Sequence, residues 1–279
     1  MLRRALSEDR WRRDATSRAV LPVDFEVTAE LVAQAPGVLS GVDSVATLIR
    51  QAGLTVVRSR PRGSRVRGGT SVITLRGSAG KVLAVERTAL NLLMHLSGVA
   101  TATRAVVDRA RRVCPGFRVL ATRKTLPGLR DLEKQAVQDG GGLPHRRDLS
   151  SGYLLKSTHL ALVPLPVAVA RAVRQARGKP VEVEVATLQQ ARGAIQAGAR
   201  QLLLDNLSPS RAARLIAGLG PGRRGVFIEV SGGITRQNIQ RYARTGADGA
   251  SLGSLTHSAP ALPFHLRLRR DRTRRGRPT

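Results

Sequence analysis

Aromatic residues are scarce in this chain of 279 residues, because Phe, Trp and Tyr together make up only 3%. A surface that stacks nucleobases on aromatic rings therefore has little material. The single cysteine, Cys114, cannot form an internal disulfide, which is consistent with a reducing compartment. The longest apolar run, residues 160–170, contains Pro164 and Pro166 and is too short to span a bilayer. Since the first residues also lack the apolar core of a secretory signal, we expect a soluble, cytoplasmic protein that does not bind membranes.

Acidic residues are few as well: 19 Asp+Glu stand against 47 Lys+Arg, so the net charge is +28, and only five of the cations are lysines. Such a charge makes nucleic acid or a strongly anionic ligand the first partner to consider. The densest basic block, residues 267–277, holds seven arginines and one aspartate. A block of this kind is usually solvated and disordered, so we expect residues 269–279 to be a basic tail without a specific nucleic-acid partner.

The first part of the chain predicts a domain with short strands and one long helix. β-rich stretches at 54–57 and 71–75 are separated by a glycine-bearing loop, and leucines recur at three- and four-residue intervals across 80–112. Hydrophobic residues make up 42% of the chain, which is enough for a sizeable core. We therefore expect an N-terminal domain over residues 1–113.

From residue 114 onward, short β-branched or leucine-rich runs alternate with helical segments, which is typical of a parallel sheet built from βα units. Strands are predicted at 119–121, 154–155, 181–185, 201–204, 226–230 and 248–252. Helices are predicted over 188–197, after a Ser208 N-cap with Pro209 in the first turn, and from Thr235 onward. The regular repeat predicts a barrel domain over residues 114–259.

Polar or glycine residues follow the six predicted strands, and the site near His145 makes a seventh such position. In α/β barrels the chemistry lies at the carboxyl ends of the strands, on the βα loops. Each residue taken alone could be a solvated loop position, but the recurrence at the same point of each unit indicates one ring of ligands. The basic members of this ring are Arg123, Lys124, His145, Arg146 and Lys156. Arginine and lysine at such positions favour a carboxylate or phosphate ligand.

Two further features narrow the class of ligand. Ser231-Gly232-Gly233 and Gly253 follow adjacent strands, and glycine lets a phosphate approach backbone N–H groups. Glu184 and Asp205 follow neighbouring strands, where a carboxylate pair facing phosphates usually binds magnesium or ribose hydroxyls. The alternative for each carboxylate is an ion pair with a nearby arginine. The residues alone thus point to an anionic sugar phosphate, a divalent ion and a second acidic substrate.

These residues lie in motifs that closely resemble the quinolinate phosphoribosyltransferase family, also called carboxylating nicotinate-nucleotide pyrophosphorylases. The matching segments occur in the family's order and extend nearly to Leu268. They are ERTALNLLMHLSGVATAT (86–103), TRKTLPGLRDLEKQAV (122–137), GGG with HR (140–146), VEVEV (181–185), LLDNLSP (203–209), EVSGGIT (229–235) and LGSLTHSAPAL (252–262).

The resemblance implies a fold of an N-terminal α/β sandwich domain followed by a seven-stranded TIM-like α/β barrel, with residues 260–268 returning to the first domain. It implies a homodimer in which each active site borrows residues from the partner's N-terminal domain. The implied reaction joins quinolinate to phosphoribosyl pyrophosphate with Mg²⁺, giving nicotinate mononucleotide, pyrophosphate and carbon dioxide for de novo NAD synthesis.

The resemblance also implies roles for individual residues. Quinolinate would be held beside Thr122 by Arg123, His145, Arg146 and Lys156, with Arg87 from the partner subunit. Lys124 would sit between the two substrates, and Glu184 and Asp205 would bind the ribose hydroxyls and, through water, the magnesium ion. Lys124, Lys156, Glu184 and Asp205 would be the catalytic groups. The 5-phosphate would lie on Ser231-Gly232-Gly233 and Leu252-Gly253-Ser254.

The chain departs from the family pattern at a few positions near these residues. Ser157-Thr158 stands where the family usually has Asp-Asn, and Pro144 replaces a common Asn. These changes remove polar groups that would orient Lys156 and its loop. Two alternatives therefore remain: a divergent paralogue that uses another pyridine-type substrate or has weak activity, and a nucleic-acid-binding protein that uses the barrel as a scaffold for the arginine-rich tail.

Overall fold

The computed structural model describes residues 1–22 and 25–269, which form two compact units. The first unit is Met1–Ala102 with the described residues from Ala259 onward, and the second is Thr103–Ser258. The basic tail and its expected disorder lie beyond Arg269, outside the described residues. Among the helices that are described, none is both long and apolar enough to cross a membrane.

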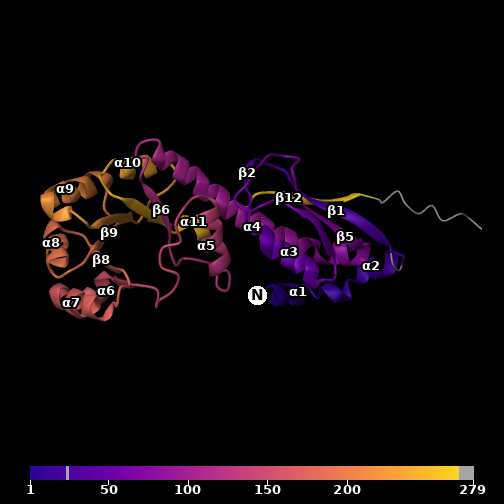
Figure 1. The fold of residues 1–279 in the computed structure, drawn as a ribbon, viewed down its shortest axis with the longest axis horizontal. Coiled ribbons are helices and arrows are strands. Elements are labelled where there is room, and N and C mark those ends of the chain that lie inside the picture. The colour runs from indigo at the N-terminus through magenta and orange to yellow at the C-terminus, as the bar shows by residue number, and fades with distance from the viewer. Residues whose placement is uncertain (23–24, 270–279) are drawn as a thin grey trace, which may run out of the picture. The chain divides into compact units, whose positions relative to one another are not determined.

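The first unit is built on an antiparallel sheet of four strands in the order β12-β1-β5-β3 (Figure 1). These strands are β1 (Glu26–Ala33), β3 (Thr55–Ser59), β5 (Ser71–Ser78) and β12 (Phe264–Arg269). Strand β12 comes from the end of the described chain and pairs with β1 from Thr28↔Arg269 to Ala33↔Phe264. The chain thus returns to its first domain, as the resemblance implies. Strands β2 (Gly37–Val38) and β4 (Arg65–Val66) form a separate, two-stranded antiparallel sheet.

Helix α3 (Val42–Gln51) packs on the sheet because it has one apolar face. It buries Val45, Leu48 and Ile49, which recur at helical spacing. The other elements before β1 are α1 (Leu2–Glu8), the 3₁₀ turn η1 (Trp11–Arg13) and α2 (Ala15–Val20). The side chain of Asp14 caps α2 by accepting hydrogen bonds from Ser17. Together these elements form the helical layer of an α/β sandwich.

Helix α4 (Ala79–Arg111) is one continuous helix of 33 residues, close to the predicted span 80–112. The two compact units divide inside this helix, between Ala102 and Thr103, and not after it at 113/114. No proline lies at that point, and Gly98, Thr101 and Thr103 are all contained in the continuous helix, so residues of the capping type do not mark the division.

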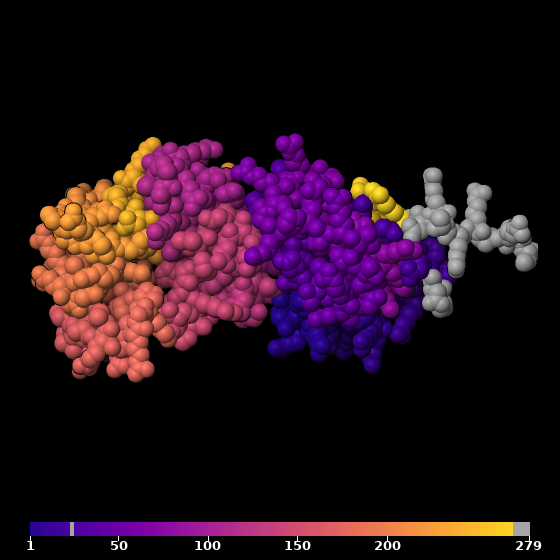
Figure 2. Space-filling view, in the orientation of Figure 1, coloured from indigo at the N-terminus to yellow at the C-terminus, as the bar shows by residue number. Residues whose placement is uncertain are grey.

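The second unit contains a parallel sheet with the strand order β6-β11-β10-β9-β8-β7. The strands are β6 (Arg118–Ala121), β7 (Tyr153–Leu155), β8 (Val181–Val185), β9 (Gln201–Asp205), β10 (Phe227–Ser231) and β11 (Gly249–Leu252). Because β11 pairs with β6, the first and last parts of this unit meet, as Figure 2 shows on the visible face. This strand order is that of a TIM-like barrel.

Leu143 takes the place of the seventh strand as an isolated parallel bridge to Leu120. Its amide donates to Val119 O and its carbonyl accepts from Ala121 N. Gly140, Gly141 and Gly142 precede Leu143, and Pro144 follows it. Since proline has no N–H and glycine disfavours extended structure, the ladder stops after one residue.

Helices follow the strands of the second unit in turn. They are α5 (Arg130–Asp139), α6 (Ser157–Leu160), α7 (Leu165–Gln175), α8 (Leu188–Gln196), α9 (Pro209–Leu219), α10 (Ile239–Ala243) and α11 (Ser254–His257), with the 3₁₀ turn η2 (Gly220–Arg223) after α9. The predicted Ser208 N-cap is present, since its side chain accepts from Arg211 N.

The prediction that a helix begins at Thr235 is wrong, because α10 begins at Ile239. Residues 235–238 form a turn instead. Thr235 N donates to Asn238 Oδ1 at 2.8 Å and Asn238 N donates to Thr235 Oγ1 at 3.3 Å. These reciprocal contacts have the form of a capping box, and Ile239 N donates to Thr235 O at 3.0 Å, so the turn leads directly into α10.

Alternation along the strands decides which residues face the barrel interior. In β8, Val181, Val183 and Val185 share one face and Glu182 and Glu184 share the other. Strand β10 repeats the arrangement, with Ile228 and Val230 buried on one face and Glu229 and Ser231 on the opposite face. The valine and isoleucine face packs against the helices, so the carboxylates point into the barrel.

Candidate active site

The carboxyl ends of the barrel strands surround one cavity of about 740 Å³ in the second unit. This cavity brings together every predicted site residue of that unit. They are Thr122, Arg123, Lys124, His145, Arg146, Lys156, Glu184, Asp205, Ser231, Gly232, Gly233, Leu252, Gly253 and Ser254. Residues spread over 130 positions of sequence meet because parallel strands end at the same edge of the sheet.

The loop after β6 carries Arg123 and Lys124 and is fixed by hydrogen bonds from both sides. Lys124 N donates to Thr122 Oγ1 at 3.1 Å, and Thr256 Oγ1 donates to Lys124 O at 2.7 Å. The stem of Lys124 packs on Gly253, where an added Cβ would lie 2.8 Å from Lys124 Cδ. The loop backbone is therefore held while the lysine head remains at the cavity surface.

Lys134 of α5 ties the loop after β6 to the loop that carries His145 and Arg146. It is 4% exposed, and its Nζ donates to Thr122 O at 3.2 Å and also to Pro144 O. Burial lowers the pKa of Lys134 to about 8, and the charges of Arg130, Arg123 and Arg146 act in the same direction. Because the contact uses the carbonyl of Pro144, the change from the family's Asn leaves it available.

The ring of His145 is turned into the barrel. Its Nε2 lies 3.1 Å from Glu182 Oε2 and 3.4 Å from Glu229 Oε2, and both carboxylates are almost fully buried. Burial by itself would lower the pKa of His145, but hydrogen bonds and charge from the two glutamates outweigh it and raise the pKa to about 10. The neighbouring Arg146 has its pKa lowered, first by burial and then by Arg123. Arg123, His145 and Arg146 thus form a dense cationic wall.

Lys156 lies between β7 and α6, and hydrogen bonds from backbone amides hold this segment in place. Its N–H donates to Nδ1 of His159 at 3.0 Å, and the next amide, Ser157 N, donates to Glu184 Oε1 at 3.3 Å. Neither contact uses the side chain of Ser157 or Thr158, the two residues that depart from the family pattern. The lysine loop is therefore anchored through backbone amides and through His159.

Asp205 ends β9 next to β8, and Asn206 fixes its carboxylate. Asn206 Nδ2 donates to Asp205 Oδ2 at 2.7 Å, and Asn206 N donates to Ser231 O at 2.8 Å. Asn206 has φ 55°, in the left-handed region that asparagine tolerates better than most residues. Among the described residues, neither Glu184 nor Asp205 is ion-paired with an arginine, in contrast to the alternative considered for them.

The glycines after β10 form a concave backbone that a side chain would fill. Gly232 has φ 91°, and an added Cβ would lie 2.1 Å from Asn206 Oδ1 and 2.9 Å from Asn206 N. Gly233 has φ 61° and faces open space. Successive amides in such a conformation make a site for an anion, since their N–H groups point the same way.

The arrangement fits a magnesium ion that arrives with a phosphorylated substrate. Glu184 and Asp205 are hard oxygen donors at adjacent strand ends, and Mg²⁺ is usually held by one or two carboxylates together with substrate phosphates and water. In the described chain, the side-chain group whose metal-binding atoms lie within 4.8 Å of one another is His145, Glu182 and Glu229, which does not include them. Two carboxylates without a third protein ligand match a substrate-borne ion.

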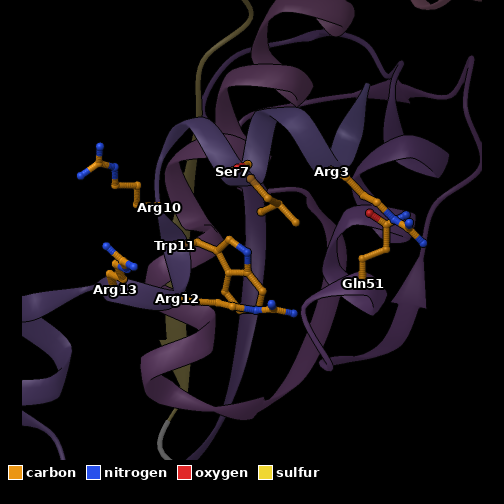
Figure 3. Close-up of a pocket in the computed structure, with 8 residues that line it drawn as sticks. Arg3, Ser7, Arg10, Trp11, Arg12, Arg13 and Gln51 are labelled. Atoms are coloured by element: carbon orange, nitrogen blue, oxygen red, sulfur yellow. The ribbon is translucent and has the colours of Figure 1, made fainter.

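Arg87 lies on α4 in the first unit, where its side chain is exposed, and is the one predicted site residue outside the second unit. The first unit also has a cavity of its own, of about 850 Å³, lined by Arg3, Leu6, Ser7, Arg10, Trp11, Arg12, Arg13 and Gln51 (Figure 3). The guanidinium of Arg12 lies 5.2 Å from the centre of the Trp11 ring. No carboxylate or glycine loop lines this cavity, so the barrel cavity is the candidate active site.

Sequence reasoning missed Glu182 and Glu229. The signal was present in the alternation of VEVEV and FIEVS, where a charged residue shares the inward face of a strand whose outward face is aliphatic. Glu184 stands at the end of its strand and was therefore predicted, whereas Glu182 and Glu229 lie further inside the barrel and were not.

Comparison with known proteins shows which family has this architecture. The family model for the N-terminal domain of quinolinate phosphoribosyl transferase matches residues 14–97, and the model for its C-terminal domain matches residues 99–267. The chain belongs to the quinolinate phosphoribosyltransferase family. The two family models meet inside α4, as the two compact units do.

Relatives in this family match nearly the whole chain. A probable carboxylating nicotinate-nucleotide pyrophosphorylase of Methanothermobacter thermautotrophicus is 40% identical, covering 96% of this chain and 98% of the relative. The enzyme of the same name from Mycobacterium leprae is 38% identical, covering 96% and 95%. The crystal structure of NadC from Streptococcus pyogenes has a TM-score of 0.88 at 36% identity and covers 96% of this chain and 95% of that one. Sequence and fold thus agree from end to end.

Proposed function

We propose that this chain transfers the phosphoribosyl group of phosphoribosyl pyrophosphate to quinolinate and removes one carboxylate, giving nicotinate mononucleotide, pyrophosphate and carbon dioxide for NAD biosynthesis. The observation that supports it best is that a single cavity joins a cationic wall, a carboxylate pair and a glycine cradle. These three parts match a dicarboxylate, a ribose with its metal ion and a phosphate. Membership of the family supplies the particular substrates.

In this proposal the cationic wall binds quinolinate. Arg123, Arg146 and Lys156 face its two carboxylates, and a guanidinium can hold a carboxylate through two parallel N–H bonds. The glycine cradle holds the 5-phosphate through backbone amides of Gly232, Gly233 and Gly253. The two substrates then lie on opposite sides of Lys124.

The reaction needs positioning and charge stabilisation more than a covalent nucleophile. The bond from ribose C1 to pyrophosphate breaks, the quinolinate nitrogen bonds to C1, and the sugar carries positive charge in between. Glu184 and Asp205 would hold the ribose hydroxyls and, through water, the magnesium ion, which neutralises the departing pyrophosphate when bound. After transfer, the positively charged ring nitrogen accepts electron density as the carboxylate on C2 leaves as carbon dioxide and C2 takes a proton.

The test is direct. The purified chain with quinolinate, phosphoribosyl pyrophosphate and Mg²⁺ is expected to release carbon dioxide and form nicotinate mononucleotide. A Lys156→Ala variant is expected to lose activity while keeping its thermal unfolding temperature, and Arg174→Ala, at an exposed position of α7, serves as the matched control. Absence of turnover together with absence of quinolinate binding by calorimetry would refute the proposal. A panel of other pyridine acids distinguishes a paralogue with a different substrate.

The sharing of active sites in a homodimer is also a proposal, supported by the exposure of Arg87 in the first unit and by family resemblance. Arg87→Ala and Lys156→Ala would each be inactive alone. When the two are mixed, unfolded and refolded together, half of the dimers would be mixed and each would hold one intact site, so activity should return to about a quarter of wild type. No recovery, or a monomer by analytical ultracentrifugation, would exclude shared sites.

A further inference from the structure

Two buried glutamates and one histidine form a cluster across the interior of the barrel. Glu182 is on β8 and Glu229 is on β10, so the two carboxylates come from strands separated by β9. They are 3% and 1% exposed, and both contact the same nitrogen, Nε2 of His145. Glu182 Oε1 and Glu229 Oε2 are buried and have no hydrogen-bond partner among the described residues, so Nε2 contacts Glu229 as an ion pair at 3.4 Å. Carboxylates so deeply buried are rare unless a cation lies between them.

The cluster forms a wall shared by two cavities. His145, Glu182 and Glu229 line the candidate active site, and they also line a second cavity of about 470 Å³. The second cavity is bordered by residues at the other ends of the strands, such as Arg118 and Phe227. The cluster therefore closes the inner end of the active-site cavity and is the layer on which the substrate would rest.

The geometry fixes which ring nitrogen of His145 carries a proton. Burial raises the pKa of Glu182, and with both carboxylates ionised an unprotonated Nε2 would direct its lone pair at two carboxylate oxygens. We therefore assign Nε2 as the donor, which leaves Nδ1 for a ligand. The backbone of His145 has φ 50°, in the left-handed region that residues other than glycine seldom occupy. Such a conformation persists only where surrounding contacts hold it, and here the ion pairs and the Lys134 contact to Pro144 O do so.

The surrounding charges are mixed, and the two glutamates are the anions nearest the ring. The other charged or titratable side chains lining the two cavities are Arg118, Arg123, Lys124, Arg146, Arg147, Tyr153, Lys156, Glu184, Asp205 and His257. The basic members disfavour a second proton on His145, whereas the glutamates favour it. The glutamates prevail, as the upward direction of the His145 pKa, to about 10, shows.

We propose that Glu182 and Glu229 are positioning residues for His145, which hold its ring by Nε2 and keep it positively charged so that Nδ1–H is presented to a carboxylate of the substrate. This inference rests on the proposed function, because it takes the anion to be the dicarboxylate quinolinate. Two carboxylates on one side of the ring thus create a permanent cation on its other side. The selectivity of the cavity for a second carboxylate then depends on residues that do not touch the substrate.

The test uses isosteric variants of the full-length protein, Glu182→Gln and Glu229→Gln, with the exposed Glu26→Gln as the matched control. The ring of His145 is titrated by NMR, its signal being assigned with His145→Asn. We expect the midpoint to fall from about 10 to about 7 in each Gln variant and to be unchanged in the control. An unchanged midpoint in both variants would overturn the proposal.

Kinetics gives a second readout that a purely structural role would not produce. At pH 6 the wild type and the Gln variants should all carry a charged His145, so their KM values for quinolinate should be similar. At pH 8.5 the variants have a neutral ring, and their KM for quinolinate should rise about tenfold while the KM for phosphoribosyl pyrophosphate stays the same. A KM that rises equally at both pH values would indicate a damaged site and would refute the charge role.

The outcomes also separate this inference from the proposed function. If the protein does not turn over quinolinate, the NMR titration still decides whether the glutamates hold the charge of His145. A divalent metal ion found at one per chain in the wild type and absent from the Gln variants would instead assign the cluster to metal binding and would overturn the proposal. If one variant fails to fold, the other carries the test.

Discussion

The two sides of the active-site cavity are built from different materials. The side formed by the loops after β6 and β7, with residues 144–146, uses charged side chains: Arg123, Arg146 and Lys156. The side formed by the loops after β10 and β11 uses backbone, with Gly232, Gly233 and Gly253. Side-chain recognition depends on charge and on the contacts that hold each group, whereas backbone recognition depends on the absence of a Cβ. Single substitutions should therefore affect the two sides in different ways.

The largest effect is expected on the side-chain half. Arg146→Ala removes a partly buried guanidinium from the cationic wall. The kcat/KM for quinolinate should fall about a thousandfold, which corresponds to about 4 kcal/mol for a lost charged hydrogen-bond partner. The Kd of phosphoribosyl pyrophosphate, measured by calorimetry, should change by less than about threefold, since the backbone half is intact. Equal loss of both affinities would contradict the division.

The backbone half should respond to a single methyl group. In Gly232→Ala the new Cβ would collide with Asn206 at a position where φ is 91°. We expect the KM for phosphoribosyl pyrophosphate to rise about a hundredfold and the free energy of unfolding to fall by about 2 kcal/mol. Gly116→Ala is the matched control, because an added Cβ there meets nothing within 4 Å. If both variants behave alike, the Asn206 contact does not decide the result.

A smaller effect is expected at the lysine that joins two loops of the side-chain half. Lys134→Met keeps the length of the side chain but removes its hydrogen bonds to Thr122 O and Pro144 O. The KM for quinolinate should rise about tenfold, since His145 and Arg146 follow Pro144 directly. The KM for phosphoribosyl pyrophosphate is the internal control and should not follow it.

The contribution of Lys134 to the free energy of unfolding should depend on pH. The pKa of Lys134 is lowered to about 8 from its ordinary 10.5, mainly by burial, so the folded state gives up this proton more readily than the unfolded state. Between these two values the unfolded state binds more protons, and stability therefore rises with pH. The free energy of unfolding of the wild type, minus that of Lys134→Met, should grow from pH 8 to pH 10.5. Denaturant titrations with no such trend would contradict the assignment.

The smallest effect is expected at the departures from the family pattern. Ser157→Ala should leave kcat/KM within about twofold, because Glu184 contacts only the backbone amide of Ser157. His159→Ala should lower kcat/KM about tenfold, because Nδ1 of His159 accepts the hydrogen bond from Lys156 N. If Ser157→Ala has the larger effect of the two, the side chain takes part in holding the lysine loop.

Much of this architecture was predictable because it is local. The strands at 181–185 and 201–204, the long helix over 80–112 and the Ser208 cap follow from hydrophobic period and capping residues, and the structure has each within one or two residues. The helix start at Thr235 was placed four residues too early, because Thr235 caps a turn that precedes the regular helix α10. The division of the two units inside α4 is not marked by any interruption of that helix.

The same distinction holds for the active site: sequence predicts which residues line it, and tertiary packing decides which atoms are in contact. Regular βα repeats predict that Lys156, Glu184 and Asp205 follow successive strands. The sequence alone therefore places them at one edge of the sheet. Which atoms then meet is a different matter. That Asn206 holds both Asp205 and the loop of Gly232, or that Lys134 reaches two carbonyls, depends on side-chain conformations set by packing.

The sequence by itself determined the family, the order of strands and helices, and the residues that ring the active site, because motifs and periodicity are written along one dimension. Only the tertiary structure decided that Glu182 and Glu229 converge on one nitrogen of His145, since β9 separates their strands and 37 or more residues separate each from the histidine. Barrel closure brings them together in a medium where charge is poorly solvated. A histidine chosen from the sequence as a substrate ligand thereby becomes a cation fixed by its neighbours.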